Sequence, residues 1–539
     1  MQRRTTRRLF AAVAAVTMLT AACGGSDDGG DADDDGGSTP TGGTFSVQST
    51  EPQSLAPTSQ CYESGCSQVL TLIDTGLLRI DPETSEQIYD HAESIESDDS
   101  KLWTVTLKEG WEFHNGEPVN AESYIRAWNE SAYGPNATQT GFFFSPVEGY
   151  DDLQGKDPQE TEMSGLVAVD DYTIEITLSE AFSQWPLVMS YTPAFAPIAE
   201  ECQDDLRACN EEPIGMGPYQ MAGPWQHNQS ITIERYDDYQ GEDVGNADTI
   251  EFKIYGNPAT AFRDWQAGNL DISDPDPSQV PTAMAEAGER VLQVDSGAFS
   301  YMGMPIFLEE FQDVRIRRAL SLDIDRETIA DKVYNGLVTP ATDVIAPFVP
   351  GSRTDACQYC VYDPEEAKRL YDEAGGLPND EVTIWFNNDG GHEQWIQAVA
   401  NTWRNDLGLS YELESQPFTP YLATVGAQKQ TGPWRLSWIP DYPSPENYLG
   451  PVYGEGGAYD GEWSGPAYDE FLQLVADGDA APSVEKGIES YQAAADVVLE
   501  ELPVVPLWFA DQFLVYSENV DNVKYSPLDQ ILLDEVTVG

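Results

Sequence analysis

The first 22 residues constrain where the rest of this chain folds. They contain four arginines and no acidic residue, and the apolar stretch from Leu9 to Ala22 follows the last arginine. A basic start, a short apolar stretch and small residues at its end are typical of a secretory signal peptide, and the stretch is too short to span a bilayer permanently. We therefore expect residues 1–22 to direct export, so that the remaining chain folds outside the cytoplasm.

The cysteine that follows this segment predicts a lipid anchor. Cys23 comes directly after Ala21-Ala22, and the whole segment resembles a bacterial lipoprotein signal, in which Cys23 would be acylated and become the mature N-terminus. A plain secreted protein cleaved nearby is the alternative, because Thr20 stands where that signal prefers Leu, Val or Ile. The run Thr6-Arg7-Arg8-Leu9-Phe10 also resembles a twin-arginine signal, so both export routes stay open.

Residues 23–43 form the expected linker. Positions 24–43 contain only Gly, Asp, Ser, Ala, Thr and Pro, a composition that cannot bury a core and behaves as a flexible coil. No later segment has enough uninterrupted apolar residues to cross a bilayer. We expect a globular body at the outer face of the cytoplasmic membrane, anchored to the lipid through Cys23.

The charge of the chain excludes some partners. Acidic residues number 93 and basic residues 27, and loss of the four arginines in residues 1–22 would give 23 − 93 = −70. A field of this sign repels nucleic acid and anionic lipid. Aromatic residues make up 11% of the chain, which excludes a disordered acidic tail. Such acidity is suited to saline or alkaline surroundings, because salt screens the self-repulsion.

Six further cysteines predict three disulfides. They stand in three close pairs, namely Cys61 and Cys66, Cys202 and Cys209, and Cys357 and Cys360. An exported compartment permits disulfides, and an even number in local pairs favours three small closed loops. The third pair has an alternative as a redox dithiol or half of a zinc site. The chain has only four histidines and no matching second pair nearby, so we expect neither a metal nor a cofactor.

Periodicity predicts a mixed α/β body. Residues 172–178 alternate apolar and polar without interruption, which indicates a half-buried strand, and similar alternation occurs at 231–233 and 250–254. Asp363-Pro364 combines a helix cap with a first-turn proline, and Gly375 predicts where that helix ends. A second helix is expected to begin after Ser483. A chain of 539 residues is longer than one core usually supports, so we expect two or three lobes.

Six blocks in order along the chain resemble one known family. The blocks are residues 77–84 (LLRIDPET), 97–122 (SDDSKLWTVTLKEGWEFHNGEPVNAE), 213–219 (PIGMGPY), 313–326 (DVRIRRALSLDIDR), 438–449 (WIPDYPSPENYL) and 502–507 (LPVVPL). Together they are similar to the family 5 extracellular solute-binding proteins, which serve ABC importers of peptides, dipeptides and nickel. Met304-Pro305 departs from that family, which usually has an aromatic residue followed by Asn before the 313–326 block.

The resemblance implies a fold, a domain division and a function. The fold would be an α/β two-lobed clamp of the periplasmic-binding-protein type II, with an additional domain. The expected segments are 44–81, 206–293 and 506–539 for lobe I, 82–205 for the additional domain, and 294–505 for lobe II. The monomeric protein would close over a solute, most simply a short peptide, and deliver it to a membrane permease without converting it.

Other functions remain open from the sequence. A metal chelate, an oligosaccharide or an opine could replace the peptide as the solute. A secreted hydrolase is the rival of another class, but neither a G-x-S-x-G nor an H-E-x-x-H motif occurs, and we identify no catalytic residue.

The resemblance also implies a site residue. In the peptide-binding relatives, an aspartate at the position of Asp441 accepts the α-ammonium of the ligand, and a carboxylate in a dry cleft makes a strong charge-assisted bond. The alternative is a turn residue, because Asp-Tyr-Pro-Ser-Pro favours turns. Trp434, Trp438 and Tyr442 could line the cleft or belong to the core.

Four basic side chains in the blocks also have two interpretations. Arg315, Arg317 and Arg318 could bind an anion or cap the scaffold. For His114 we expect local hydrogen bonding in a turn, with a ligand or catalytic role as the alternative.

Overall fold

A computed structural model describes residues 42–56, 64–81, 84, 86–388, 391–454, 457–459, 461–526, 528 and 530–539. The described residues belong to one compact unit, Thr39–Gly539. The predicted signal peptide, Cys23 and all but the last two residues of the predicted linker lie outside the described residues.

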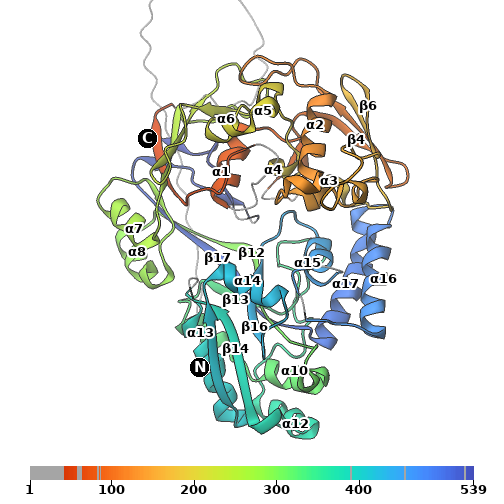
Figure 1. Ribbon diagram of the computed structural model, residues 1–539. Helices are drawn as coiled ribbons and strands as arrows, with labels where there is room; N and C mark the ends of the chain where they lie inside the picture. The colour runs from red at the N-terminus through yellow and green to blue at the C-terminus, as the bar shows by residue number, and fades with distance from the viewer. Residues whose placement is uncertain are drawn as a thin grey trace, which may run out of the picture. The chain divides into compact units, whose positions relative to one another are not determined.

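An eleven-stranded mixed sheet connects distant parts of the chain (Figure 1). In sheet order its strands are β15 (Ser410–Gln416), β14 (Glu381–Asn387), β16 (Trp434–Trp438), β12 (Val291–Gly303), β17 (Val504–Tyr516), β11 (Ile272–Ser273), β1 (Thr44–Ser49), β10 (Thr249–Ile254), β9 (Ser230–Arg235) and β8 (Tyr219–Met221), with β13 (Val338–Pro340) beside β17. β1 runs parallel to β10 and β14 parallel to β15, whereas β12 and β17 are antiparallel.

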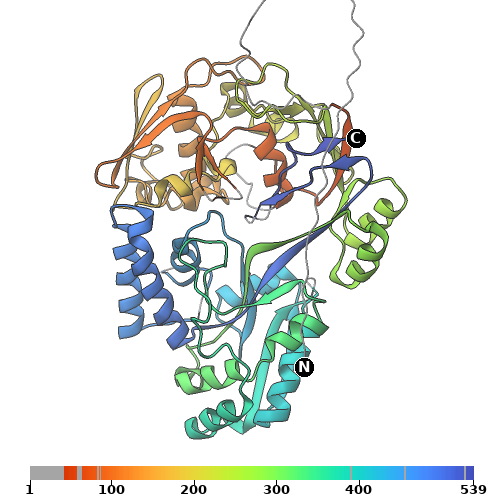
Figure 2. The same ribbon diagram turned by 180° about the vertical axis from the view of Figure 1, so that it is seen from behind.

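β12 and β17 are the two strands that join the halves of this sheet (Figure 2). Each has 13 residues, and their pairing shifts register between Asp295 and Phe299 and again between Ser300 and Tyr301. Register shifts of this kind bend a strand and increase its twist. The expected lobe boundaries at residues 293/294 and 505/506 both fall within these two strands.

A separate sheet occupies the segment expected to be the additional domain. Its order is β4 (Ala92–Glu96), β5 (Leu102–Leu107), β7 (Thr173–Thr177) and β6 (Leu166–Asp170). Its helices are α2 (Ala121–Ala132), α3 (Trp185–Val188), α4 (Thr192–Phe195) and α5 (Glu200–Asp204), and α6 (Leu206–Glu211) follows at the start of the expected lobe I segment. Short two-stranded ladders pair β2 (Leu78–Ile80) with β3 (Gln87–Tyr89), β18 (Val520–Asp521) with β21 (Thr537–Val538), and β19 (Tyr525–Ser526) with β20 (Gln530–Ile531).

The remaining helices pack around the large sheet. They are α1 (Ser64–Ile73), α7 (Pro258–Gln266), α8 (Val280–Ala287), α9 (Glu309–Gln312), α10 (Val314–Leu322), α11 (Arg326–Lys332), α12 (Pro364–Ala374), α13 (Glu393–Thr402), α14 (Phe418–Gly426), α15 (Pro445–Tyr453), α16 (Pro466–Asp479) and α17 (Val484–Glu501). α16 and α17 form an antiparallel pair (Figure 1). The local predictions for α12 and β7 are confirmed: Asp363 caps the Glu366 amide, Gly375 ends α12 at φ 92°, and β7 spans Thr173–Thr177.

Buried apolar side chains form several distinct cores. One is built almost entirely from residues 77–216 and a second from residues 45–73, 219–272 and 514–536. Two more lie among residues 299–509. This division agrees with the expectation of several lobes and with the α/β fold class.

Two of the three predicted disulfides are present. Cys202–Cys209 and Cys357–Cys360 are bonded in this structure, as predicted. Cys61 lies outside the described residues, and its pairing with Cys66 stays a prediction.

Loss of the Cys202–Cys209 bond should lower stability only modestly. The bond closes a loop between residues 7 positions apart, so the chain-entropy model gives about 2 kcal/mol. We expect the C202S/C209S double variant to fold and to melt a few degrees lower in circular dichroism. Failure of this variant to fold would contradict the view that the bond only fixes a loop.

Candidate functional site

Asp441 lies in the loop that connects β16 to α15. Ser444 caps the helix by accepting a hydrogen bond from the Glu446 amide at 3.1 Å, and Pro445 occupies the first helical position. The turn-forming sequence thus ends β16 and starts α15 within six residues, 439–444. Asp441 stands at the middle of this connection and is half-buried.

One amide side chain joins Asp441 to a neighbouring aromatic residue. The Oδ1 atom of Asn447 accepts hydrogen bonds from the Asp441 backbone N–H at 3.0 Å and from the Trp438 Nε1–H at 3.1 Å. Its Nδ2 atom donates to Asp441 Oδ2 at 3.2 Å. The structure therefore brings Asp441 and Trp438 together, and the half-buried Trp438 stays a candidate wall of a solute site.

The other two predicted wall residues have almost no exposed surface. Trp434 is 0% exposed and stacks on Tyr459, with ring centroids 5.7 Å apart. Tyr442 is 4% exposed, packs against the core of residues 77–216, and donates a hydrogen bond to Glu446 Oε2 at 2.5 Å. Both serve as core residues in this conformation, whereas Asp441 and Trp438 keep accessible surface.

Burial makes the acidic groups of this region easier to protonate. It raises the pKa of Asp441 to about 7, although the hydrogen bond from Asn447 acts in the opposite direction. Burial also raises the pKa of Glu446, and the nearby charge of Asp479 raises it further. A cationic group placed against Asp441 would favour its ionised form and would be bound strongly there.

Three distant segments meet at this loop. Ser444 Oγ donates to Gln184 Oε1 at 2.8 Å, and the Ser183 backbone N–H donates to the Asp479 carbonyl at 2.8 Å. The bulged part of β12 also approaches closely, because a Cβ atom on Gly297 would lie 2.5 Å from Pro440 Cγ. The loop therefore contacts both a strand that joins the halves of the large sheet and the segment expected to be the additional domain.

A cavity of about 200 Å³ with a mixed polar and apolar lining lies elsewhere among the described residues. It is formed where β1, β11 and β17 meet the N-terminus of α1, and none of its lining residues belongs to the Asp441 loop. The residues are Val47, Gln48, Ser49, Thr50, Ser64, Gly65, Gln68, Ile272, Asp274, Gln512, Leu514, Tyr525 and Ile531.

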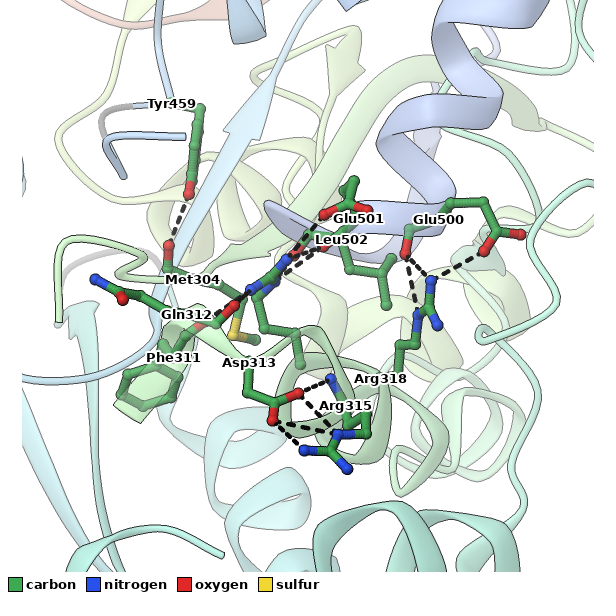
Figure 3. A network of polar contacts seen from close by, with 11 residues as sticks. Met304, Phe311, Gln312, Asp313, Arg315, Arg318, Tyr459, Glu500, Glu501 and Leu502 are labelled. Carbon is green, nitrogen blue, oxygen red and sulfur yellow. Dashed lines mark hydrogen bonds and ion pairs between the residues drawn. The ribbon is translucent and has the colours of Figure 1, made fainter. Parts of the chain in front are cut away.

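The adjacent arginines belong to the scaffold (Figure 3). Arg315 binds the carboxylate of Asp313, and Arg318 binds the carbonyl and carboxylate of Glu500. Arg317 is 2% exposed and donates to backbone carbonyls of Phe311, Gln312, Glu501 and Leu502. These contacts favour capping over an anion site.

His114 also makes scaffold contacts. Its backbone N–H donates to the Gly215 carbonyl at 2.8 Å, and its ring Nε2 lies 3.0 Å from the Gly217 carbonyl oxygen. Burial lowers its pKa to about 4. The ring is therefore neutral at physiological pH. These contacts support the expected scaffold role, but they join the 114 turn to the distant 213–219 block, so the expectation of local hydrogen bonding was wrong.

The described residues contain neither a cluster of metal-ligating side chains nor a membrane-spanning helix. No group of three or more His, Cys, Asp or Glu side chains among them could hold a metal ion. None of the helices in the described part of the chain is long and apolar enough to span a membrane.

The sequence reasoning missed Asn447 as a site residue. It lies within the 438–449 block, but its side chain contacts Asp441 and Trp438, six and nine positions earlier. The periodicity of a sequence does not indicate contacts between a helix and the loop before it. The available signal was its place three residues after Ser444-Pro445 begins a helix, in the first turn of that helix.

The chain and its fold are similar to known solute-binding proteins. The chain is 26% identical over 493 residues to the oligopeptide-binding protein OppA of Bacillus subtilis, covering 88% of each chain. Its fold is similar to Haemophilus influenzae OppA in complex with RPPGFSPFR (TM-score 0.74, 23% identity, 92% and 99% coverage). It is similarly close to a dipeptide-binding protein from Pseudoalteromonas sp. SM9913 in complex with Met-Leu (TM-score 0.74, 20% identity, 92% and 100% coverage).

These structures confirm the two-lobed type II fold class. The match to a family model confirms the resemblance seen in the sequence. Residues 86–460 match the model of the bacterial extracellular solute-binding proteins, family 5 Middle. The six blocks that suggested this resemblance lie between residues 77 and 507, and four of them fall inside the matched region. The chain therefore belongs to family 5 of the bacterial extracellular solute-binding proteins.

Proposed function

We propose that this protein binds a short peptide and delivers it to the permease of an ABC importer. The observation that supports this most directly is the half-buried Asp441 carboxylate, fixed between β16 and α15 and suited to a solute ammonium group. The relatives named for oligopeptides and dipeptides support the same solute class. Trp438 would form part of the wall beside the peptide.

The movement that accompanies binding would occur about the two long strands. Lobe I would comprise residues 44–81, 206–293 and 506–539, and lobe II residues 294–505, with 82–205 as the additional domain. Solute would stabilise the closed arrangement in proportion to its differential affinity for that state. The register shifts in β12, next to the Asp441 loop, are suited to such bending.

The remaining parts of the proposal concern location and chemistry. Cys23 would carry the lipid that anchors a monomeric receptor to the outer face of the cytoplasmic membrane. The protein would release its solute unchanged, with no catalytic residue and no cofactor. Turnover assays with chromogenic peptides and glycosides test this point, and sustained hydrolysis would contradict it.

The peptide hypothesis predicts dependence on a free amino terminus. We expect alanine peptides of two to six residues to raise the melting temperature. At a peptide concentration near 100 times Kd, binding should increase the free energy of unfolding by about 2.7 kcal/mol. The same peptides with acetylated amino termini should bind the wild type at least about 30-fold more weakly, because they leave Asp441 without a cation. Asp441→Asn should lose this difference, since its side chain keeps the shape without the charge.

Calorimetry of the wild type and D441N with both peptide series measures these affinities. The acetylated peptides serve as the matched control, since D441N should leave their affinity nearly unchanged. Equal binding of free and acetylated peptides by the wild type would show that Asp441 does not hold an ammonium group. No binding of any peptide would favour a non-peptide solute.

A further inference from the structure

The side chain of Asn447 contacts both candidate site residues that keep accessible surface. It is 1% exposed and makes three hydrogen bonds, two to Asp441 and one to the Trp438 indole. Each end of its amide group is therefore used. A buried amide with this many specific partners fixes the geometry of the groups that it contacts.

The chemistry of the partners determines the orientation of this amide. The Asp441 backbone N–H and the Trp438 Nε1–H are both donors, so the atom between them must be the amide oxygen. The Asp441 carboxylate accepts hydrogen bonds when ionised, so the atom facing it must be the amide NH₂ group. The opposite orientation would place the NH₂ group against two donors and the amide oxygen against a carboxylate.

The helix that carries Asn447 is itself held in place. Asn447 is the third residue of α15, and Ser444 caps this helix. The Ser444 hydroxyl also donates to Gln184, which lies in the segment expected to be the additional domain. The next residue, Tyr448, donates its hydroxyl to the Gly297 carbonyl at 2.7 Å. A site residue supported in this way keeps its geometry within the tolerance that specific binding requires.

We propose that Asn447 is the positioning residue of the solute site: it sets the direction of the Asp441 carboxylate toward the ammonium group of the solute. This inference rests on the proposed function. Asn447 donates to Asp441 Oδ2 from the first turn of α15, so the solute would meet the other carboxylate oxygen. Its N–H donor also favours the ionised form of Asp441, which a cationic solute needs.

Two substitutions separate positioning from general support of the fold. Asn447→Asp has nearly the same shape and can still accept both N–H bonds, but it replaces the donor to Asp441 with a repelling carboxylate. Asn447→Leu has a similar volume and removes all three hydrogen bonds. Asn269→Asp is the matched control, because it adds the same charge at an exposed position.

The measurement is calorimetric affinity for alanine peptides with free and with acetylated amino termini. We expect N447D and N447L to bind free peptides at least tenfold more weakly than the wild type, with acetylated peptides changed less than threefold. N269D should behave as the wild type does. A purely structural role would instead weaken both peptide series equally, and that result would overturn the proposal.

The outcomes also separate this inference from the proposed function. If the wild type prefers free peptides and both Asn447 variants keep the full preference, the positioning role is wrong and the peptide function stands. If the wild type binds no alanine peptide or shows no preference, the proposed ammonium contact is wrong and the role of Asn447 fails with it. Retained binding of acetylated peptides shows that a variant is folded.

Discussion

Arg317→Met should destabilise the protein by at least about 3 kcal/mol, because it leaves several buried carbonyls without a donor. The guanidinium of Arg317 donates to Glu501 and Leu502 at the C-terminal end of α17, and to Phe311 and Gln312 at the end of α9. The last carbonyls of a helix have no partner within the helix. Arg317 therefore supplies donors to two helix ends at once, and its charge is favourable at a helix C-terminus.

Arg318→Met is the matched control for this prediction. Arg318 is more exposed, and it binds Glu500 and lies over the Tyr359 ring, 4.5 Å from its centroid, so its loss should cost less than the loss of Arg317, about 1 to 2 kcal/mol. Arg317→Lys should resemble Arg317→Met, because a single ammonium cannot bridge both helix ends. Thermal unfolding of the three variants measures the difference. Equal melting temperatures for R317M and R318M would contradict the capping role of Arg317.

These arginines show why part of the structure could not be predicted from the sequence. Successive residues of a helix point about 100° apart, so Arg317 and Arg318 face different surroundings although they are adjacent. The 313–326 block suggested a scaffold role for them as a group. Only the packing of α10 against the end of α17 reveals that Arg317 is buried and Arg318 is not.

Local elements were predictable because their signals are local. The alternation at 172–178 and the caps at Asp363 and Gly375 depend on neighbours within a few residues, and the structure contains β7 and α12 where these signals placed them. Trp434 and Tyr442 had no such signal. An aromatic residue near a loop has the same sequence pattern whether it lines a cleft or fills a core, and here both are buried.

The second large effect concerns pH. We expect the protein to lose stability as pH rises from 6.5 to 8, because buried carboxyl groups then lose protons that the folded state favours. Burial raises the pKa of Glu446 from 4.5 to about 8, with Asp479 nearby as a second cause. The folded state therefore binds more protons than the unfolded state across this range, and stability falls as pH increases. Asp441, with its pKa raised to about 7, acts in the same direction.

Buried histidines act in the opposite direction but at lower pH. Burial lowers the pKa of His91 and His114 to about 4, so their unfolded forms bind the extra proton and stability rises with pH up to about 6.5. His227 has a raised pKa because of Glu51 and Glu211, and it loses its stabilising proton as pH increases. Above pH 6.5 the buried carboxyl groups therefore dominate.

Glu446→Gln tests this assignment. A single group with a folded pKa near 8 loses about 2 kcal/mol between pH 6.5 and 8, since one pKa unit corresponds to about 1.4 kcal/mol. Glutamine keeps an acceptor for Tyr442 without titrating, so E446Q should melt higher than the wild type at pH 8 and depend less on pH. Glu489→Gln, which removes an exposed charge from α17, should leave the pH dependence unchanged.

If E446Q and E489Q change the pH dependence equally, the surface charge of this acidic chain causes the effect, and Glu446 does not. If only E446Q reduces it, the protonated carboxyl of Glu446 stabilises the junction where Gln184, Ser444 and Asp479 meet, and alkaline conditions loosen that junction.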